Sequence, residues 1–118
     1  MSFKRISLTL AVFAALGAAA TANAATPKLT GETGPGYTIQ VKAGSTKVKT
    51  LKAGTYTIKV EDKSAIHNFH LIGPGVNKST GISFTGETTW KVKLKAGKYT
   101  YQCDAHAFEG MKGTFKVT

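Results

Sequence analysis

The only cysteine of this 118-residue chain stands close to a histidine and a methionine, in the order Cys103, His106 and Met111. A thiolate, an imidazole and a thioether are soft or borderline donors that suit the Cu(I)/Cu(II) couple. The spacing Cys-x2-His-x4-Met lets one tight loop at the end of a strand present three donors to one point. A fourth donor must then come from a distant segment, where His67 and His70 are the candidates. Two histidines and a cysteine in a plane, with a weak axial methionine, form the electron-transfer type of copper site.

The two upstream histidines are not equivalent. Residues 66–72, with the sequence Ile-His-Asn-Phe-His-Leu-Ile, are predicted as a central strand buried on both faces. In a strand, His67 shares a face with Phe69, whereas His70 shares the opposite face with Asn68. One buried metal ion therefore takes only one of the two histidines.

The first 24 residues are predicted to be a secretory signal. Lys4 and Arg5 precede an apolar run over residues 6–20, and Ala22-Asn23-Ala24 is a small-x-small cleavage site, so the mature chain is expected to start near Ala25. This run is too short to span a bilayer comfortably, and no later segment can span one. Export to the periplasm or the cell exterior follows, and metal ligation explains a lone thiol in an oxidising compartment.

The mature chain is strongly basic. Removing Lys4 and Arg5 from the 16 basic residues leaves 14 lysines against six acidic residues, a net charge of about +8. Lysines that alternate with apolar residues are typical of the solvated face of strands, and steering toward an anionic redox partner is the functional alternative. Nucleic acid is not expected as a partner, because the mature chain is exported and contains no arginine.

The pattern along the chain predicts an all-β protein. Residues 25–36 are expected to form a loose lead-in, and residues 37–118 one domain folded as a Greek-key β-sandwich. The sequence Leu-Lys-Ala-Gly occurs at 51–54 and again at 94–97, and each copy has a tyrosine two residues after its glycine. Both copies are predicted to be hairpin turns. Apolar residues alternate with polar ones in four sets: Tyr56, Ile58 and Val60; Trp90, Val92 and Leu94; Tyr99, Tyr101 and Cys103; Phe115 and Val117.

His67-Asn68 followed by Cys103-x2-His106-x4-Met111 resembles the cupredoxin family, with the loop length of its plastocyanin branch. The resemblance covers residues 37–118 and implies a Greek-key sandwich that holds one copper ion. It implies that His67, Cys103, His106 and Met111 are the ligands and that His70 is not, leaving His70 a packing or hydrogen-bonding role. It also implies that Asn68 holds the ligand loop near the thiolate. Ala105 departs from the family pattern, in which a proline commonly precedes the loop histidine.

The resemblance and the signal-like N-terminus together predict an exported, monomeric carrier of single electrons and not an enzyme. His106 is expected at the surface edge of the site, where Ala105, Ala107 and Phe108 form an apolar docking patch for redox partner proteins. A copper-delivery protein with the same ligands is the main alternative. A structural zinc domain, a copper enzyme and a Cys103/His106 nucleophile and base are weaker alternatives, since they leave Met111 unexplained or need groups that the sequence does not supply.

Overall fold

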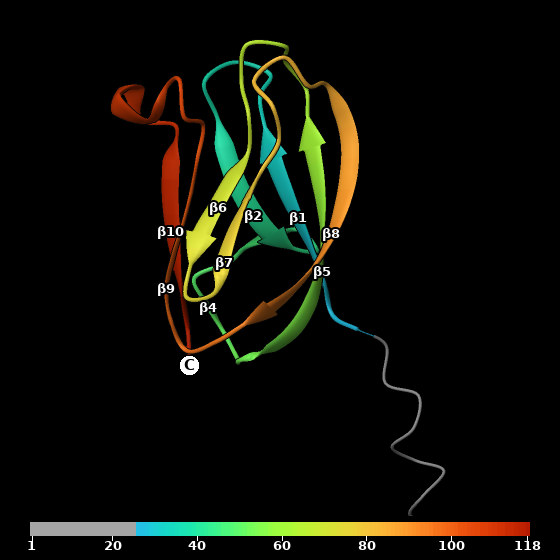
Figure 1. The fold of residues 1–118 in the computed structure, drawn as a ribbon, viewed down its shortest axis with the longest axis vertical. Coiled ribbons are helices and arrows are strands. Elements are labelled where there is room, and N and C mark those ends of the chain that lie inside the picture. The colour runs from blue at the N-terminus through green and yellow to red at the C-terminus, as the bar shows by residue number, and fades with distance from the viewer. Residues whose placement is uncertain (1–25) are drawn as a thin grey trace, which may run out of the picture.

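The fold is a sandwich of two five-stranded sheets (Figure 1). The computed structural model describes residues 26–118, and the expected signal segment 1–24 lies outside this range. The first sheet has the order β3 (Thr46–Lys47), β2 (Ile39–Ala43), β1 (Lys28–Thr33), β5 (Gly54–Asp62) and β8 (Gly86–Leu94). The second has the order β4 (Thr50–Leu51), β10 (Lys112–Val117), β9 (Gly97–Gln102), β6 (His70–Gly73) and β7 (Val76–Ser79). The prediction of an all-β sandwich is confirmed.

Most neighbouring strands are antiparallel, but β1 pairs with β5, and β4 with β10, in parallel. Both Leu-Lys-Ala-Gly segments carry the chain from one sheet to the other, from β4 to β5 and from β8 to β9. The prediction that they are hairpin turns was therefore wrong. A tyrosine two residues after each glycine fixes the crossing: the hydroxyl of Tyr56 donates to the carbonyl of Lys52 at 2.7 Å, and that of Tyr99 donates to the carbonyl of Lys95 at 3.1 Å.

The segment 25–36 is not the loose lead-in that its composition suggested. Residues 28–33 form β1, which lies between β2 and β5 in the first sheet, so the folded domain begins well before residue 37. Its only large apolar residue is Leu29, and the strand is therefore not evident as an alternating pattern. Gly31 is buried because the Phe69 ring covers it: a Cβ at Gly31 would lie 2.6 Å from Cζ of Phe69.

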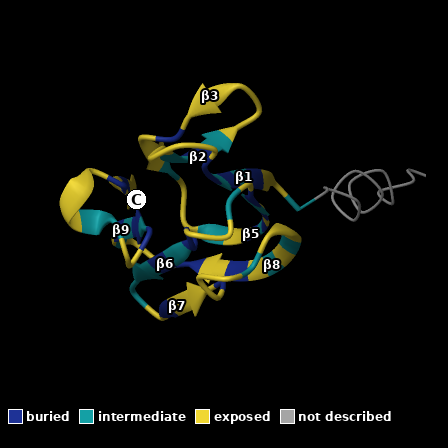
Figure 2. Cartoon of the chain, turned by 90° about the horizontal axis from the view of Figure 1, so that it is seen from above, coloured by how far each residue is buried: buried dark blue, intermediate teal, exposed yellow. Residues whose placement is uncertain are grey.

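The core lies between the two sheets, and buried residues line their facing surfaces (Figure 2). The predicted alternation on β5, β8, β9 and β10 is confirmed by their burial patterns. Aromatic rings stack within this core: the centroids of Tyr99 and Phe115 are 5.3 Å apart, and those of Phe69 and Tyr101 are 6.1 Å apart. This packing anchors β9, which leads directly to Cys103.

The two ends of the sandwich differ in their loops. The longer loops, at residues 34–38, 63–69, 80–85 and 103–111, gather at the end drawn uppermost in Figure 1, which we call the upper end. The last of them contains the short 3-10 helix η1 (Ala107–Glu109). Tight turns between β4 and β5, β6 and β7, and β8 and β9 lie at the lower end. Within residues 26–118, no helix has the length and apolarity needed to cross a membrane.

Candidate metal centre

His67 lies in the loop between β5 and β6, not in a strand. The structure starts β6 at His70, so the predicted strand over 66–72 was wrong for its first four residues. Ile66 is 53 % exposed, whereas His67, Asn68 and Phe69 are all buried in succession, which no strand alternation would produce. The loop is held from two sides: the N–H of Lys63 donates to the carbonyl of Thr33, and the N–H of Phe69 donates to the hydroxyl of Thr80.

The ring of His67 is fixed in one orientation by the loop at 34–38. Its Nε2 lies 2.7 Å from the carbonyl oxygen of Gly36, which can only accept a hydrogen bond. Nε2 therefore carries the proton, and in the neutral ring Nδ1 keeps its lone pair. A histidine that donates its second ring nitrogen to a carbonyl group is oriented as metal ligands usually are.

The loop at 103–111 is closed by its own backbone. The N–H of Cys103 donates to the carbonyl of Met111 at 3.0 Å, and the N–H of Met111 donates to the carbonyl of His106 at 3.2 Å. Gly110 turns the chain back with a φ of 96°, in the left-handed region that glycine adopts without strain. The nine residues of this closed loop therefore have little conformational freedom, and three of them carry potential metal donors.

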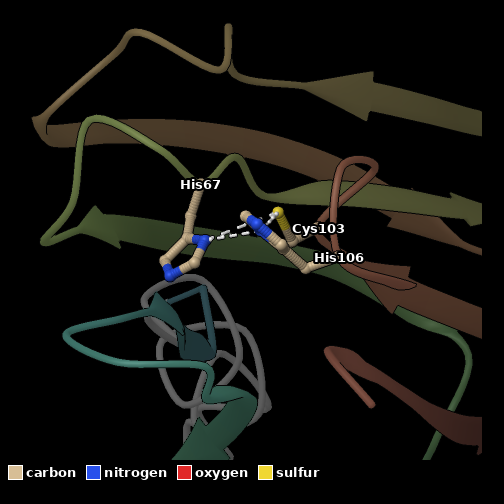
Figure 3. Close-up of side chains that lie close together, drawn as sticks. All are labelled: His67, Cys103 and His106. Carbon is tan, nitrogen blue, oxygen red and sulfur yellow. Dashed lines mark hydrogen bonds between the residues drawn. The ribbon is translucent and has the colours of Figure 1, made fainter. Parts of the chain in front are cut away.

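The side chains of His67, Cys103 and His106 point toward one another (Figure 3). The two histidine Nδ1 atoms are 3.0 Å apart, and Sγ of Cys103 lies 3.8 Å from Nδ1 of His67 and 3.5 Å from Nδ1 of His106. Cys103 and His67 are buried, and His106 is half-buried. Among residues 26–118, this is the only group of three or more His, Cys, Asp or Glu side chains that is close enough to hold one metal ion.

Met111 is fully buried at the end of the same loop. The hydrogen bond from the N–H of Cys103 to its carbonyl holds the backbone of Met111 next to Cys103. Its role as an axial ligand stays a prediction.

Tyr37 covers the cluster from the 34–38 loop and was missed by the sequence analysis. Its ring meets both histidine rings edge-on, with centroids 5.3 Å from His67 and 4.8 Å from His106. The run Gly34-Pro35-Gly36-Tyr37 predicts a turn, but only the pairing of β1 and β2 brings that turn to the histidines.

Asn68 links the two ligand-bearing loops. Its side-chain NH₂ donates to Asp104 Oδ2 at 2.9 Å and to the carbonyl of Thr80 at 3.2 Å, while its Oδ1 accepts the N–H of Asp104 at 2.8 Å. Asp104 directly follows Cys103. These contacts tie the loop that bears His67 to the loop that bears Cys103, and the role of Asn68 beside a metal stays a prediction.

His70 stays outside the cluster and pairs with Asp104 instead. Nδ1 of His70 lies 2.8 Å from Asp104 Oδ1, and its Nε2 lies 2.6 Å from Asn77 Oδ1. Burial alone would lower the pKa of His70, but the hydrogen bonds to Asn77 and Asp104 and the charge of Asp104 outweigh it and raise the pKa above the usual 6.5. Burial alone would raise the pKa of Asp104, but hydrogen bonds from Gln102, His70 and Asn68 lower it below the usual 3.8.

Comparison with solved structures finds the same architecture in rusticyanin. A reduced rusticyanin superposes with a TM-score of 0.58 at 22% sequence identity, covering 81% of each chain. A mutant of rusticyanin gives a TM-score of 0.60 at 22% identity, covering 81% of this chain and 80% of that one. The chain has the cupredoxin fold. Rusticyanin from Thiobacillus ferrooxidans matches at 22% identity with a TM-score of 0.57 over 81% of this chain and 79% of that one, and a further rusticyanin structure is described as a copper protein. No protein-family model and no curated protein sequence matches the chain.

Within this cupredoxin fold, His67, Cys103 and His106 form a candidate ligand set for one copper ion. Two imidazole nitrogens and one sulfur match the donors of a trigonal copper site. The Nδ1 atoms of His67 and His106 are 3.0 Å apart, close enough for one cation or one proton to lie between them. The donor set therefore fits copper on chemical grounds.

Proposed function

We propose that this protein carries single electrons on one copper ion that alternates between Cu(I) and Cu(II). His67, Cys103 and His106 would bind the ion in a plane, and Met111 would bind it weakly on the axis. The observation that carries the proposal is the convergence of the two Nδ1 atoms and the buried Sγ, whose ligand atoms lie within 4.8 Å of one another.

The way the donors are held favours electron transfer. Gly36 fixes the ring of His67, and the backbone hydrogen bonds of Met111 with Cys103 and His106 fix the loop that bears the other donors. Donors held by the protein need to move little when the charge of the metal changes, so the reorganisation energy stays small. A bound copper ion supplies the one-electron redox couple.

The half-buried His106 is the proposed route for the electron. Ala105, Ala107 and Phe108 flank it, and Phe108, in η1, is fully exposed. An exposed apolar patch around a metal ligand suits brief docking of a redox partner protein. We further propose that the carrier is exported, on the strength of the signal-like residues 1–24, and that it works as a monomer.

The proposal is tested by the visible absorption spectrum of the purified protein during titration with Cu(II). An intense thiolate-to-copper charge-transfer band is expected at one equivalent, bleached by a reductant and restored by an oxidant. Cys103→Ser removes the thiolate and should abolish the band. As the matched control, His70→Gln changes a nearby histidine that is not a proposed ligand and should keep it.

The axial role of Met111 needs its own test. Met111→Leu keeps the volume and apolarity of the side chain but removes the sulfur. The band should remain, because its chromophore is the copper–thiolate bond, and the reduction potential should rise, because a lost donor weakens Cu(II) more than Cu(I). An unchanged potential would exclude Met111 from the coordination sphere.

The main alternative, copper delivery, predicts rapid loss of the metal. Cys103 is fully buried and His67 is 1 % exposed, which favours a retained ion over a transferable one. Copper that leaves the protein on reduction would favour delivery. Absence of the band together with tight Zn²⁺ binding would favour a structural zinc site. We expect no catalysis, because an enzyme needs an open coordination position and Met111 is proposed to fill the fourth.

A further inference from the structure

The acidic residues of the molecule gather at one of its two ends. All six acidic residues lie at or next to the upper end, because they occur in the 103–111 loop or at the strand ends beside the upper loops. Glu32, Glu61 and Glu87 form one row across β1, β5 and β8, and Glu61 directly precedes Asp62 at the end of β5. Asp104 and Glu109 lie in the ligand loop.

The lower end carries the opposite charge. Six exposed lysines surround its turns and the strand ends beside them, and we call this surface the lysine end: Lys49, Lys52, Lys93, Lys95, Lys98 and Lys116. The ion pairs formed by lysines within residues 26–118 involve Lys42 and Lys59, and none of these six. Their charges are therefore not neutralised within the described part of the protein.

Three of these lysines share one open groove. Lys98 on β9 stands directly opposite Lys116 on β10, and the N–H of Lys116 donates to the carbonyl of Lys49. The groove is lined by these three lysines together with Gly97, Thr114 and Phe115. Like charges directly opposite each other on neighbouring strands destabilise a sheet. An anion in this groove would relieve that repulsion.

We propose that the lysine end docks on an anionic phospholipid bilayer and that the metal site then faces away from the membrane. A protein partner is less suited to this surface, because protein interfaces centre on buried apolar anchors. The exposed large hydrophobic residues of the described chain are Tyr37, Ile66, Ile82 and Phe108, and all four lie in upper loops. Polynucleotides are disfavoured by the absence of arginine in the mature chain. Lysines without apolar anchors fit the diffuse charge of lipid phosphates, which attract each lysine near the surface.

This orientation leaves the other end of the molecule free. His106 and Phe108 are at the upper end, so a docked molecule would still present them to a redox partner. The proposal goes beyond electron transfer and does not depend on copper, because none of the six lysines is a proposed ligand.

The test is co-sedimentation with phosphatidylcholine vesicles that contain or lack phosphatidylglycerol, at low and at high salt, with and without copper. Binding is expected only to the anionic vesicles and should weaken as salt rises. The triple variant Lys49→Gln, Lys98→Gln and Lys116→Gln should bind about a hundredfold more weakly. The triple variant Lys59→Gln, Lys63→Gln and Lys112→Gln has the same net charge but keeps the lysine end, and it should lose less than about tenfold.

Three results would overturn the proposal. Equal losses in the two triple variants would mean that only net charge matters. A comparable loss in Phe108→Ala would mean that the upper end enters the bilayer instead. Binding to poly-glutamate but not to anionic vesicles, or no binding to either, would assign the lysine end to an acidic protein or to no partner.

Discussion

Nδ1 of His70 lies 2.8 Å from Oδ1 of Asp104, so a histidine that is not in the metal cluster is coupled to the residue that directly follows Cys103. Asp104 also accepts a hydrogen bond from Gln102 at 2.9 Å. Both ring nitrogens of His70 face oxygen atoms, an arrangement that favours the doubly protonated, charged ring. His70 therefore contacts the ligand loop and lies outside the cluster.

The stability of the metal-free protein should depend on this pair. The pKa of His70 is raised in the folded state, so its stabilisation is fully present below about 6.5 and is lost as pH rises through the folded-state pKa. His70→Gln should lower the free energy of unfolding by about 1 kcal/mol in mildly acid solution, a small figure because Asp104 is partly solvated. Urea unfolding of both proteins across pH measures this. A difference that grows toward alkaline pH would contradict the assignment.

Asn68 should contribute more to the free energy of unfolding than Asn77, the other asparagine near the ligand loop. Asn68→Ala removes three hydrogen bonds and leaves the N–H of Asp104 without its partner, so we expect a loss of about 3 kcal/mol in the free energy of unfolding. The control is Asn77→Ala, which removes one bond to His70 at an exposed position and should cost less than about 1 kcal/mol. Similar losses in the two variants would mean that Asn68 does not link the loops.

Tyr37 should slow the exchange of copper. Its ring contacts the rings of both His67 and His106 and lies over the cluster from the 34–38 loop. Tyr37→Ala removes edge-to-face contacts worth about 1 kcal/mol, so a chelator should strip copper roughly fivefold faster. Phe108→Ala is the matched control, since Phe108 is fully exposed and its loss should leave the rate unchanged. Equal rates in all three proteins would exclude Tyr37 as a cover.

Asp62 should destabilise the protein at neutral pH. Burial raises its pKa above the usual 3.8, against the lowering effect of a hydrogen bond from the N–H of Ser64, and its Oδ2 has no hydrogen-bond partner. Because the pKa of Asp62 is raised in the folded state, Asp62 does not destabilise the protein below about pH 3.8. Its destabilising contribution appears as pH rises through the folded-state pKa.

Asp62→Asn should therefore raise the free energy of unfolding at pH 7 by about 1 kcal/mol, and the gain should disappear in acid. The unpaired Oγ1 of Thr33, opposite Asp62 in the register of β1 and β5, is a potential acceptor for the new amide. Glu61→Gln, at the half-buried neighbour, should change stability by less than about 0.5 kcal/mol. Thermal unfolding at pH 7 and pH 3 distinguishes the two variants, and a loss of stability in Asp62→Asn at pH 7 would contradict the prediction.

The sequence by itself determined the features that depend on short spacings. Alternation over β5, β8, β9 and β10 is local, because successive side chains of a strand point to opposite faces, and it predicted the two-layer β fold. The spacing of Cys103, His106 and Met111 is also local, because one closed loop contains all three residues. The resemblance to cupredoxins rests on these same residues together with His67 and Asn68.

Only the tertiary structure decided the features that depend on neighbours far apart in the chain. β1 has one large apolar residue, and its central place follows from pairing with β2 and β5 and from the Phe69 ring over Gly31. The buried run at His67 reflects a loop enclosed by Gly36, Thr80 and Asp104. The lysine end arises in the same way, because strand direction carries the acidic residues to one end and brings six lysines from different strands together at the other. Periodicity reports which face of a strand is buried, but not which strands are neighbours or which ends meet.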